Sequence, residues 1–353
     1  MRALRAYFHF ELLRRYNRIV IGDRSFTMQE VNTLVPVSYD DAAGWIVSEC
    51  DAVIPSLPKT YLGTEKGEVA RVTKGMAMAL KARMLLYAAS PLNNPGGDAG
   101  RYLEAAAAAK ELIDAGIYKL VSEETTNNAD AQGLIFGKWC PVSSFARTLI
   151  YNGATFKGQP VQSYVGGRNG RPLDGATPTS YYLRKHIVEA TSFVTGSEMS
   201  YQHIFPFFRY AEVLLNYAEA LAAATQNPDF TGMKGEVEYT LSPREALNAV
   251  RARYNMPGIT ETDYAAFVKR LRNERRVELA FEGHRFWDIR RWKIGAETTK
   301  VYGLTITPQN DGSFSYMRSV IQQRGWEDRM NFYPIADAEL FKNHNLVQND
   351  GWK

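Results

Sequence analysis

The sequence predicts a mainly α-helical protein, built from stacked pairs of helices and interrupted by a loop-rich insert with short strands. Three observations support this prediction. Apolar residues recur every three to four positions over most of the 353 residues, which is the period of an amphipathic helix. A basic start followed by aromatic residues and leucines occurs three times, at 5–13, 81–89 and 209–220. Between 117 and 205 the helical period is lost, and glycine, serine, threonine and asparagine become frequent.

Two helices are expected before Pro58. Apolar side chains recur at helical spacing over 3–16, which predicts the first helix. Ser38 stands three residues before an acid, an arrangement that resembles a capping box and predicts the start of the second helix. This helix is expected to stop near Pro55 or Pro58, because proline cannot continue an α-helix.

The next two helices are rich in alanine. Residues 74–89 are apolar on nearly every side, so this helix is expected to be buried, and its small side chains let neighbouring helices approach closely. Asp98 suits the N-cap of the following helix, and Gly116 suits its end. Beyond it we expect loops, with short strands at 148–151 and 162–165.

Helices are expected to resume after the loop-rich region. Pro206 suits the first turn of a helix, and an apolar stripe follows it. Residues 242–245, Ser-Pro-Arg-Glu, form a full capping box with proline at the first helical position. A further helix is expected to begin near Thr262 and to continue through 272–292, and the tail from Lys300 onward is expected to be irregular.

The helices are expected to stack in pairs. Two of the three repeated segments are followed by an alanine-rich helix, at 105–115 and 246–253, and such pairs bury their shared faces by stacking, as tetratricopeptide repeats do. The chain is therefore divided into an amino-terminal helical scaffold (1–116), an irregular region (117–205) and a carboxy-terminal helical region with its tail (206–353). We expect the three parts to pack as one domain.

Composition argues against several classes of protein. A net charge of +4 is too small to indicate nucleic-acid binding, and no apolar run approaches the ~18 residues of a membrane span. Cysteines and histidines lack metal-ligand spacing, and no phosphate loop or Gly-x-Ser-x-Gly motif is present. We therefore predict no metal, no cofactor and no catalytic residue. Acidic residues are abundant, so a glycoside hydrolase with paired carboxylates stays open as an alternative.

The segment 272–292 carries dense charge, with six arginines and four acidic residues. Like charges four residues apart destabilise an isolated helix, so partners must come from a neighbouring element, and the polar stripe between 209 and 219 offers them. We predict a buried ionic network of Arg209, Glu212, Glu219, Arg275, Arg276, Glu278, Glu282 and Arg285. The alternative is a site for phosphate or an acidic ligand, built from Arg275, Arg285 and Arg291.

Most aromatic residues lie at helical spacing, but several stand among glycine, asparagine and glutamine in the loop-rich region. Sugar rings present an apolar face and a polar rim, so a site for them needs exposed flat rings beside amides. The candidate ligand-binding residues are Trp139, Tyr151, Asn152, Phe156 and Tyr164. The alternative interpretation is that these rings anchor long loops to the helical scaffold.

Four segments, in order along the chain, resemble motifs of a known family. They are the end of an alanine-rich helix, Leu86-Tyr87-Ala88-Ala89-Ser90-Pro91; the start of another, Arg209-Tyr210-Ala211-Glu212; the segment Arg272–Trp292; and an ending with Tyr333-Pro334-Ile335 and Gln348-Asn349-Asp350-Gly351-Trp352. On these motifs almost the whole chain resembles the SusD/RagB family of outer-membrane nutrient-binding lipoproteins.

The resemblance implies an all-α protein at the outer face of an outer membrane, held there by a lipid anchor, that binds oligosaccharide or, in some relatives, peptide. It also implies a partner, a SusC-like TonB-dependent transporter, over which the protein would act as a hinged lid. The chain begins like the interior of an amphipathic helix, so we expect the natural amino terminus and its anchor to lie upstream. Relatives also carry a segment that is lacking here near 140–143, so we expect part of the ligand surface to be absent.

Three functions remain open on the sequence. The leading hypothesis is a non-catalytic glycan-binding protein of the cell surface that delivers oligosaccharide to the transporter. A helical scaffold that holds a peptide or another protein on its concave face is the first alternative. A glycoside hydrolase, which would need a catalytic acid outside the helices, is the second.

Overall fold

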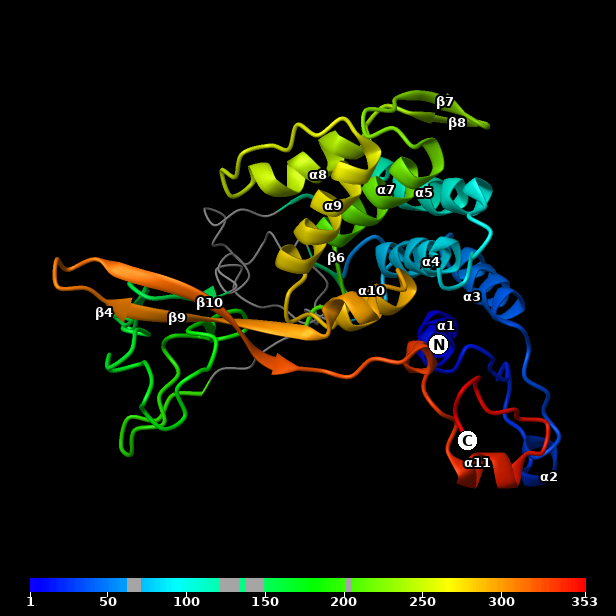
Figure 1. Ribbon diagram of the computed structural model, residues 1–353. Coiled ribbons are helices and arrows are strands. Elements are labelled where there is room, and N and C mark those ends of the chain that lie inside the picture. The colour runs from blue at the N-terminus through cyan, green and yellow to red at the C-terminus, as the bar shows by residue number, and fades with distance from the viewer. Residues whose placement is uncertain (62–70, 121–133, 137–148, 201–204) are drawn as a thin grey trace.

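The computed structural model describes residues 1–61, 71–120, 134–136, 149–200 and 205–353. Within them the protein is mainly helical, with short strands and one long β-hairpin (Figure 1). The helices gather into one body, and the hairpin projects from it beside the loops of 149–200 (Figure 1). The predicted fold class is confirmed.

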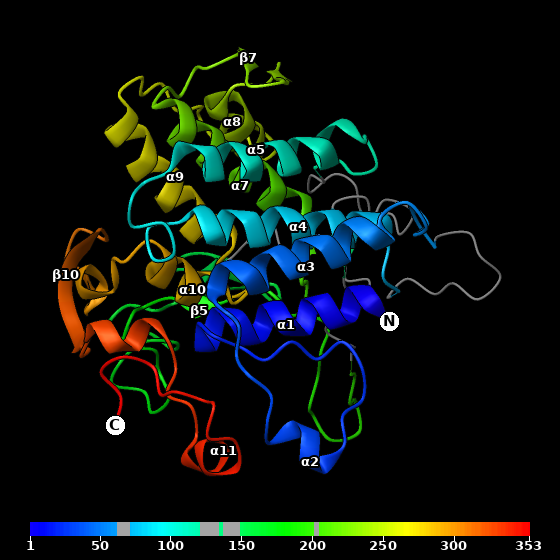
Figure 2. The same ribbon diagram turned by 90° about the vertical axis from the view of Figure 1, so that its right-hand side faces the viewer.

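The body is a stack of helices. Its members are α1 (Arg2–Tyr16), α3 (Tyr39–Val53), α4 (Lys74–Ala89), α5 (Ala99–Asp114), α7 (Tyr210–Thr225), α8 (Pro243–Ala252), α9 (Tyr264–Glu278) and α10 (His284–Arg291). Helix α1 packs on α3, α3 on α4, α4 on α5, α5 on α7 and α7 on α8. Figure 2 shows α1, α3, α4 and α5 as successive layers, so neighbours in sequence are neighbours in space, as the predicted helix pairs require.

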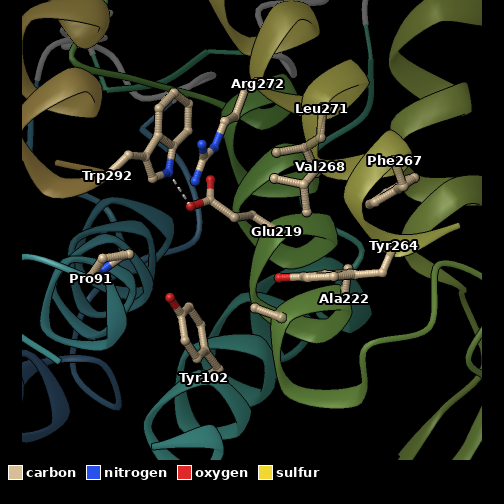
Figure 3. A pocket seen from close by; sticks show the side chains of 11 residues that line it. Pro91, Tyr102, Glu219, Ala222, Tyr264, Phe267, Val268, Leu271, Arg272 and Trp292 are labelled. Carbon is tan, nitrogen blue, oxygen red and sulfur yellow. Dashed lines mark hydrogen bonds between the residues drawn. The ribbon is translucent and has the colours of Figure 1, made fainter. Parts of the chain in front are cut away.

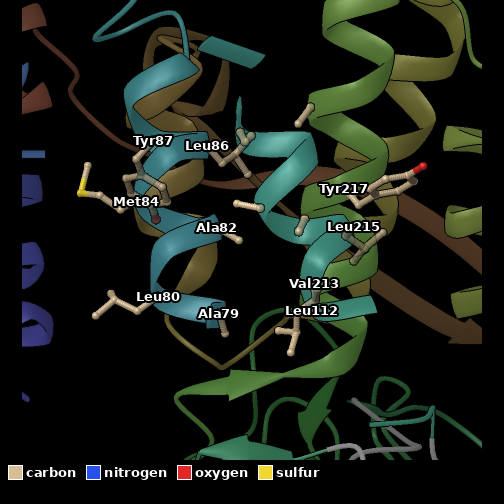
Figure 4. Close-up of a cluster of buried hydrophobic side chains, with 14 of the residues drawn as sticks. Ala79, Leu80, Ala82, Met84, Leu86, Tyr87, Leu112, Val213, Leu215 and Tyr217 are labelled. Carbon is tan, nitrogen blue, oxygen red and sulfur yellow. The ribbon is translucent and has the colours of Figure 1, made fainter. Parts of the chain in front are cut away.

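The centre of the hydrophobic core lies between α4, α5 and α7 (Figure 4). Twelve of the sixteen residues of α4 are buried, which confirms the prediction of a helix covered on nearly every side. Ala79 and Ala82 on α4 leave room for close neighbours, and Leu112 and Leu215 fill the space from α5 and α7.

The predicted capping residues explain three helix starts. The Ser38 hydroxyl accepts a hydrogen bond from the Asp41 N–H at 3.1 Å, and an Asp98 carboxylate oxygen accepts one from the Gly100 N–H at 2.8 Å. At Ser242 the full capping box forms. These bonds satisfy N–H groups that have no partner within the helix.

The helix predicted to start at Pro206 begins later, at Tyr210. Residues Phe208–Arg209 form strand β6, which pairs with β1 (Leu134–Phe136). Arg209 has extended backbone angles (φ −130°, ψ 150°), so it caps the helix from outside. The helix starts later than predicted because the residues before it pair with a distant strand. Local helix propensity carries no information about such pairing.

The continuous helix predicted through 272–292 is wrong, because the chain breaks between α9 and α10. Phe281 (φ 63°) and Gly283 (φ 79°) adopt left-handed backbone conformations that end an α-helix. Gly283 was the available signal in the sequence. The break places Glu282 outside both helices, where its side chain is free to turn toward Arg209.

Two small antiparallel strand pairs form in the described part of the loop-rich region. Strand β2 (Leu149–Ile150) pairs with β5 (Tyr182–Leu183), and β3 (Thr155–Phe156) with β4 (Gln159–Pro160). The strand predicted at 148–151 is thus present at 149–150, but the one predicted at 162–165 is wrong. There the chain forms turns instead, with the Asn169 N–H donating to the Gln162 carbonyl at 3.0 Å.

The tail predicted to be irregular contains a hairpin of β9 (Lys300–Pro308) and β10 (Phe314–Gln323), so that expectation is wrong. The sequence did hold a strand signal, because β-branched residues cluster at Thr305-Ile306-Thr307 and a turn with Gly312 at φ 82° follows. A second, shorter hairpin joins β7 (Gly232–Lys234) and β8 (Val237–Tyr239).

Short helices complete the described structure: α2 (Met28–Val31), η2 (Gly295–Thr298), η3 (Asp328–Asn331) and α11 (Asp337–Lys342). The Tyr333 N–H donates to the Arg15 carbonyl at 2.7 Å, which ties the carboxy-terminal tail to α1. Among the described residues, none of the helices combines the length and the apolar character needed to cross a bilayer.

Candidate functional site

The first group of buried charges surrounds Glu282 in the break between α9 and α10. Arg209 donates to Glu282 (Nε–Oε2 2.7 Å) and to Glu278 (Nη2–Oε1 2.9 Å). Lys185 reaches Glu282 from the loop-rich region and also donates to the carbonyls of Glu278 and Ala280, at 2.9 and 3.0 Å. Burial opposes the charge on Arg209, but Glu282 and Glu278 outweigh it and raise the pKa of Arg209. One carboxylate thus joins three separate parts of the chain.

The second group lies between α7, α9 and α10. Arg275 donates to the Asn216 amide oxygen at 2.5 Å and to Asp288. Arg291 binds Asp288 (Nε–Oδ1 2.9 Å) and both oxygens of Glu219. Burial would raise the pKa of Glu219, but Arg291 and its neighbours lower that pKa to about 2. The polar stripe of α7 therefore faces the arginine-rich segment.

Three of the eight predicted network residues, Glu212, Arg276 and Arg285, lie outside these two groups, and Glu212 pairs instead with Arg83. Arg276 is exposed, and within the described residues neither it nor Arg285 forms an ion pair. Burial, followed by the nearby Arg276, lowers the pKa of Arg285. Spacing along one helix therefore did not reveal which of its charged residues form ion pairs.

Several partners were missed by sequence reasoning. Arg83 of α4 forms a buried pair with Glu212 (Nε–Oε1 2.7 Å), and a charged residue inside an otherwise apolar helix was a usable signal. Lys185 carried no such signal, since it stands in an irregular stretch. The alternative of a phosphate site at Arg275, Arg285 and Arg291 finds no support, because Arg275 and Arg291 are each only 1% exposed and already bind acidic groups.

A pocket of about 100 Å³ lies between α5, α7, α9 and the end of α10 (Figure 3). Tyr102 and Tyr264 point their hydroxyl groups toward it, and Trp292 closes one end. The Trp292 Nε1–H donates to Glu219 at 2.7 Å, while the Arg272 guanidinium lies 4.9 Å from the Trp292 ring centre. The pocket is thus a cleft in which the charged side chains of Glu219 and Arg272 both contact Trp292.

The predicted ligand-binding aromatics differ in what surrounds them. Tyr151 is 58% exposed, whereas Tyr164 packs on Phe314 of β10 with ring centres 5.1 Å apart. The Arg184 guanidinium lies 6.0 Å from the Phe156 ring. The Asn152 amide oxygen accepts a hydrogen bond from the Ser163 N–H at 3.1 Å.

Trp139 lies outside the described residues. Tyr151 therefore offers an open ring among the candidates that the structure describes, and Tyr164 and Asn152 support the loops.

In the described part of the chain, no three His, Cys, Asp or Glu side chains lie close enough together to bind a metal ion. Cys50 is fully buried on α3, where it packs as a small core residue. Burial, followed by the nearby Arg83 and Arg275, lowers the pKa of His284 well below its usual value, so this imidazole is neutral at pH 7.

Comparison with known proteins agrees with this architecture. A family model described as the SusD family matches residues 144–352, more than half of the chain. The SusD-like protein P2 of Formosa agariphila is 33% identical over 146 residues, a match that covers 40% of this chain and 24% of that protein. The chain thus spans about a quarter of the length of this curated relative.

Two solved structures from Bacteroides fragilis share the fold. One is a SusD-like protein with a TM-score of 0.78 and 24% identity, covering 99% of this chain and 79% of the other. The second is described as a SusD-like carbohydrate binding protein and has a TM-score of 0.73 and 23% identity, covering 98% of this chain and 78% of the other.

Proposed function

Because this chain belongs to the SusD family, we propose that it binds an oligosaccharide at the cell surface without transforming it and delivers it to a TonB-dependent transporter of the outer membrane. Family membership carries this proposal. The fold shared with a SusD-like carbohydrate binding protein supports the sugar as ligand. The transporter partner, the outer-membrane location and the lipid anchor rest on the family alone.

The chemistry of the buried acids supports binding without catalysis. A glycosidase needs a carboxylic acid whose pKa is raised so that it can protonate the leaving group. Glu219, Glu278 and Asp288 instead have lowered pKa values, because the arginines around them outweigh the effect of burial. These acids are ionised at neutral pH and hold the fold together.

The ligand surface is proposed on the loops of 149–165. Tyr151 stands at the end of β2 with an exposed ring, and the turn that follows it is held by the hydrogen bond between Asn152 and Ser163. A ring on a fixed loop can stack on the apolar face of a sugar with little loss of conformational entropy.

Titration calorimetry of the full-length protein with a panel of oligosaccharides tests the proposal. We expect at least one sugar to bind, and Tyr151→Ala to weaken its binding by roughly tenfold, since a lost stacking contact is worth about 1 kcal/mol or more. Phe341→Ala is the matched control, because this ring is 78% exposed on the distant helix α11. Failure of every sugar to bind, or equal loss in both variants, would contradict the proposal.

Peptide binding remains a second candidate, favoured by the pocket in Figure 3. Its volume of about 100 Å³ suits one apolar side chain, and stacked helix pairs are typical of peptide-binding scaffolds. Including peptides in the panel separates the two candidates, and Ala222→Leu, which fills the pocket, should abolish peptide binding while leaving sugar binding unchanged.

A further inference from the structure

The outer edge of strand β10 has unpaired backbone groups. Strand β9 uses its far edge internally: the Leu304 N–H donates to the Thr179 carbonyl at 3.3 Å, and the Ile306 carbonyl accepts from the Val165 N–H at 2.8 Å. Leu304 and Ile306 therefore point their backbone groups away from β10. In an antiparallel pair the residues directly opposite such positions also point theirs outward.

The register identifies these opposite residues as Arg318 and Tyr316. By the two-residue alternation of a strand, Phe314 and Val320 share their direction. None of these four residues forms a backbone hydrogen bond through its outer edge to any residue that the structure describes. Figure 2 places β10 at one margin of the molecule.

The side chains leave this edge open. Tyr316, Met317 and Val320 are 60%, 62% and 48% exposed. Natural edge strands are commonly protected by proline, by several charges or by a bulge. Between 314 and 320 the strand has no proline or glycine and a single charge, Arg318, and its irregularity in register comes only after Val320. The edge is thus a template for one more strand.

We propose that this edge pairs with the β10 edge of a second copy of the chain, antiparallel and centred on Met317. This register sets Tyr316 opposite Arg318 and Phe314 opposite Val320, so all four outward-facing positions of each copy meet outward-facing positions of the other. The two hairpins then form one four-stranded sheet. Aromatic rings meet an arginine or a branched aliphatic chain, which are favourable cross-strand pairs.

Charge selects this register. A centre at Arg318 would also bring outward-facing residues together, but it would place the two copies of Arg318 directly opposite each other, and like charges in that position are destabilising. With Met317 at the centre, the Arg318 guanidinium, which already lies 3.7 Å from the centre of the Tyr302 ring, faces Tyr316 of the second copy. The interface is small, so the dimer is expected to be weak.

Sedimentation equilibrium of the full chain up to about 100 µM measures the association, a range that suits weak interfaces. Tyr316→Pro removes an N–H that points outward and leaves the bonds to β9 in place, so we expect it to weaken dimerisation at least tenfold. Tyr316→Phe keeps that N–H and should associate like the wild type. Circular dichroism checks that both variants are folded.

Crosslinking tests the register independently. In a Cys140→Ser background, Met317→Cys should form a disulfide-linked dimer under mild oxidation, because the two copies of residue 317 would be directly opposed at a distance that a disulfide spans. Ser319→Cys, on the same face but opposite Ser315, should not. A protein that stays monomeric and gives no Met317→Cys crosslink overturns the proposal, as does a dimer that Tyr316→Pro leaves intact. Pairing of this edge only with a different protein would show that the second copy is the wrong occupant.

Discussion

The helical body and the β9–β10 hairpin differ in how their polar groups are paired. In the body, Arg275 and Glu282 are almost completely buried, and each meets partners from other elements. In the hairpin, the backbone groups of Tyr316 and Arg318 face outward without a partner in the described chain. A closed network holds a scaffold in one arrangement, whereas an open edge or ring is available to a ligand. We therefore propose that the body provides a rigid scaffold and that the loops and the hairpin provide recognition.

The largest effect is expected from Glu282→Gln, which breaks the closed network. The change keeps the shape of the side chain but leaves Arg209 and Lys185 buried without the carboxylate that they share. We expect the free energy of unfolding to fall by about 3–5 kcal/mol, the usual cost of stranding a buried charge. Urea unfolding followed by circular dichroism measures it.

The control for this variant is Glu236→Gln, since Glu236 is exposed beside the short hairpin of β7 and β8. Its unfolding free energy should stay within about 0.5 kcal/mol of the wild type. Equal losses in the two variants would mean that the ionic network contributes nothing specific to the body.

A slightly smaller effect is expected from acid. The pKa of Glu219 is lowered to about 2 from an unfolded value of 4.5, so its ion pair with Arg291 stabilises the fold above the unfolded pKa. That stability is lost as the pH falls from about 5 to about 2, and amounts to roughly 2–3 kcal/mol. Glu278, Glu282 and Asp288 also have lowered pKa values and add loss in the same direction.

Unfolding free energies at a series of pH values test this dependence, with Glu219→Gln as the comparison. This variant should be less stable at neutral pH, and its stability should decline less steeply in acid. A profile as steep as that of the wild type would show that Glu219 titrates normally in the folded protein.

Much of the fold could be predicted from the sequence because the interactions that form and cap helices join residues close together in the chain. Ser38, Asp98 and Ser242 cap helices through bonds that span two or three residues, and α4 revealed its burial by composition. One error arose where a distant segment decides the outcome, because Arg209 entered a strand through its pairing with β1. The hairpin of β9 and β10 had a local strand signal, but its contacts to Thr179 and Val165 could not be predicted, because those residues are far away in sequence.

The candidate site was less predictable for the same reason. Charge spacing on 272–292 indicated that partners were needed, but it could not identify Lys185 or Arg83, which come from other parts of the chain. Aromatic residues among glycines were recognisable as a class. Whether a ring is open, like Tyr151, or packed, like Tyr164, depends on the hairpin that lies beside it.

A moderate effect on stability is expected where the loops of 149–200 contact the hairpin. Tyr164→Ala removes the ring contact with Phe314 that joins the loops to the hairpin. Because the contact lies at the margin of the body, global unfolding should change by only about 0.5–1.5 kcal/mol. Limited proteolysis should show faster cleavage within 149–200, whereas the body stays intact. Equal protection of the loops in both proteins would contradict the role of Tyr164 as an anchor.

The smallest effect on stability is expected at Tyr151, for which we propose a role in ligand binding alone. Tyr151 is 58% exposed, so Tyr151→Ala should shift the unfolding free energy by no more than about 0.5 kcal/mol. The same variant is expected to lose oligosaccharide affinity, so stability and binding separate at this residue. A thermal melt run with and without ligand tests both halves: the apo melting temperature should match that of the wild type, and the stabilisation by ligand should shrink. A lowered apo melting temperature would instead make Tyr151 part of the scaffold, and the division between a closed body and an open recognition side would no longer hold at this ring.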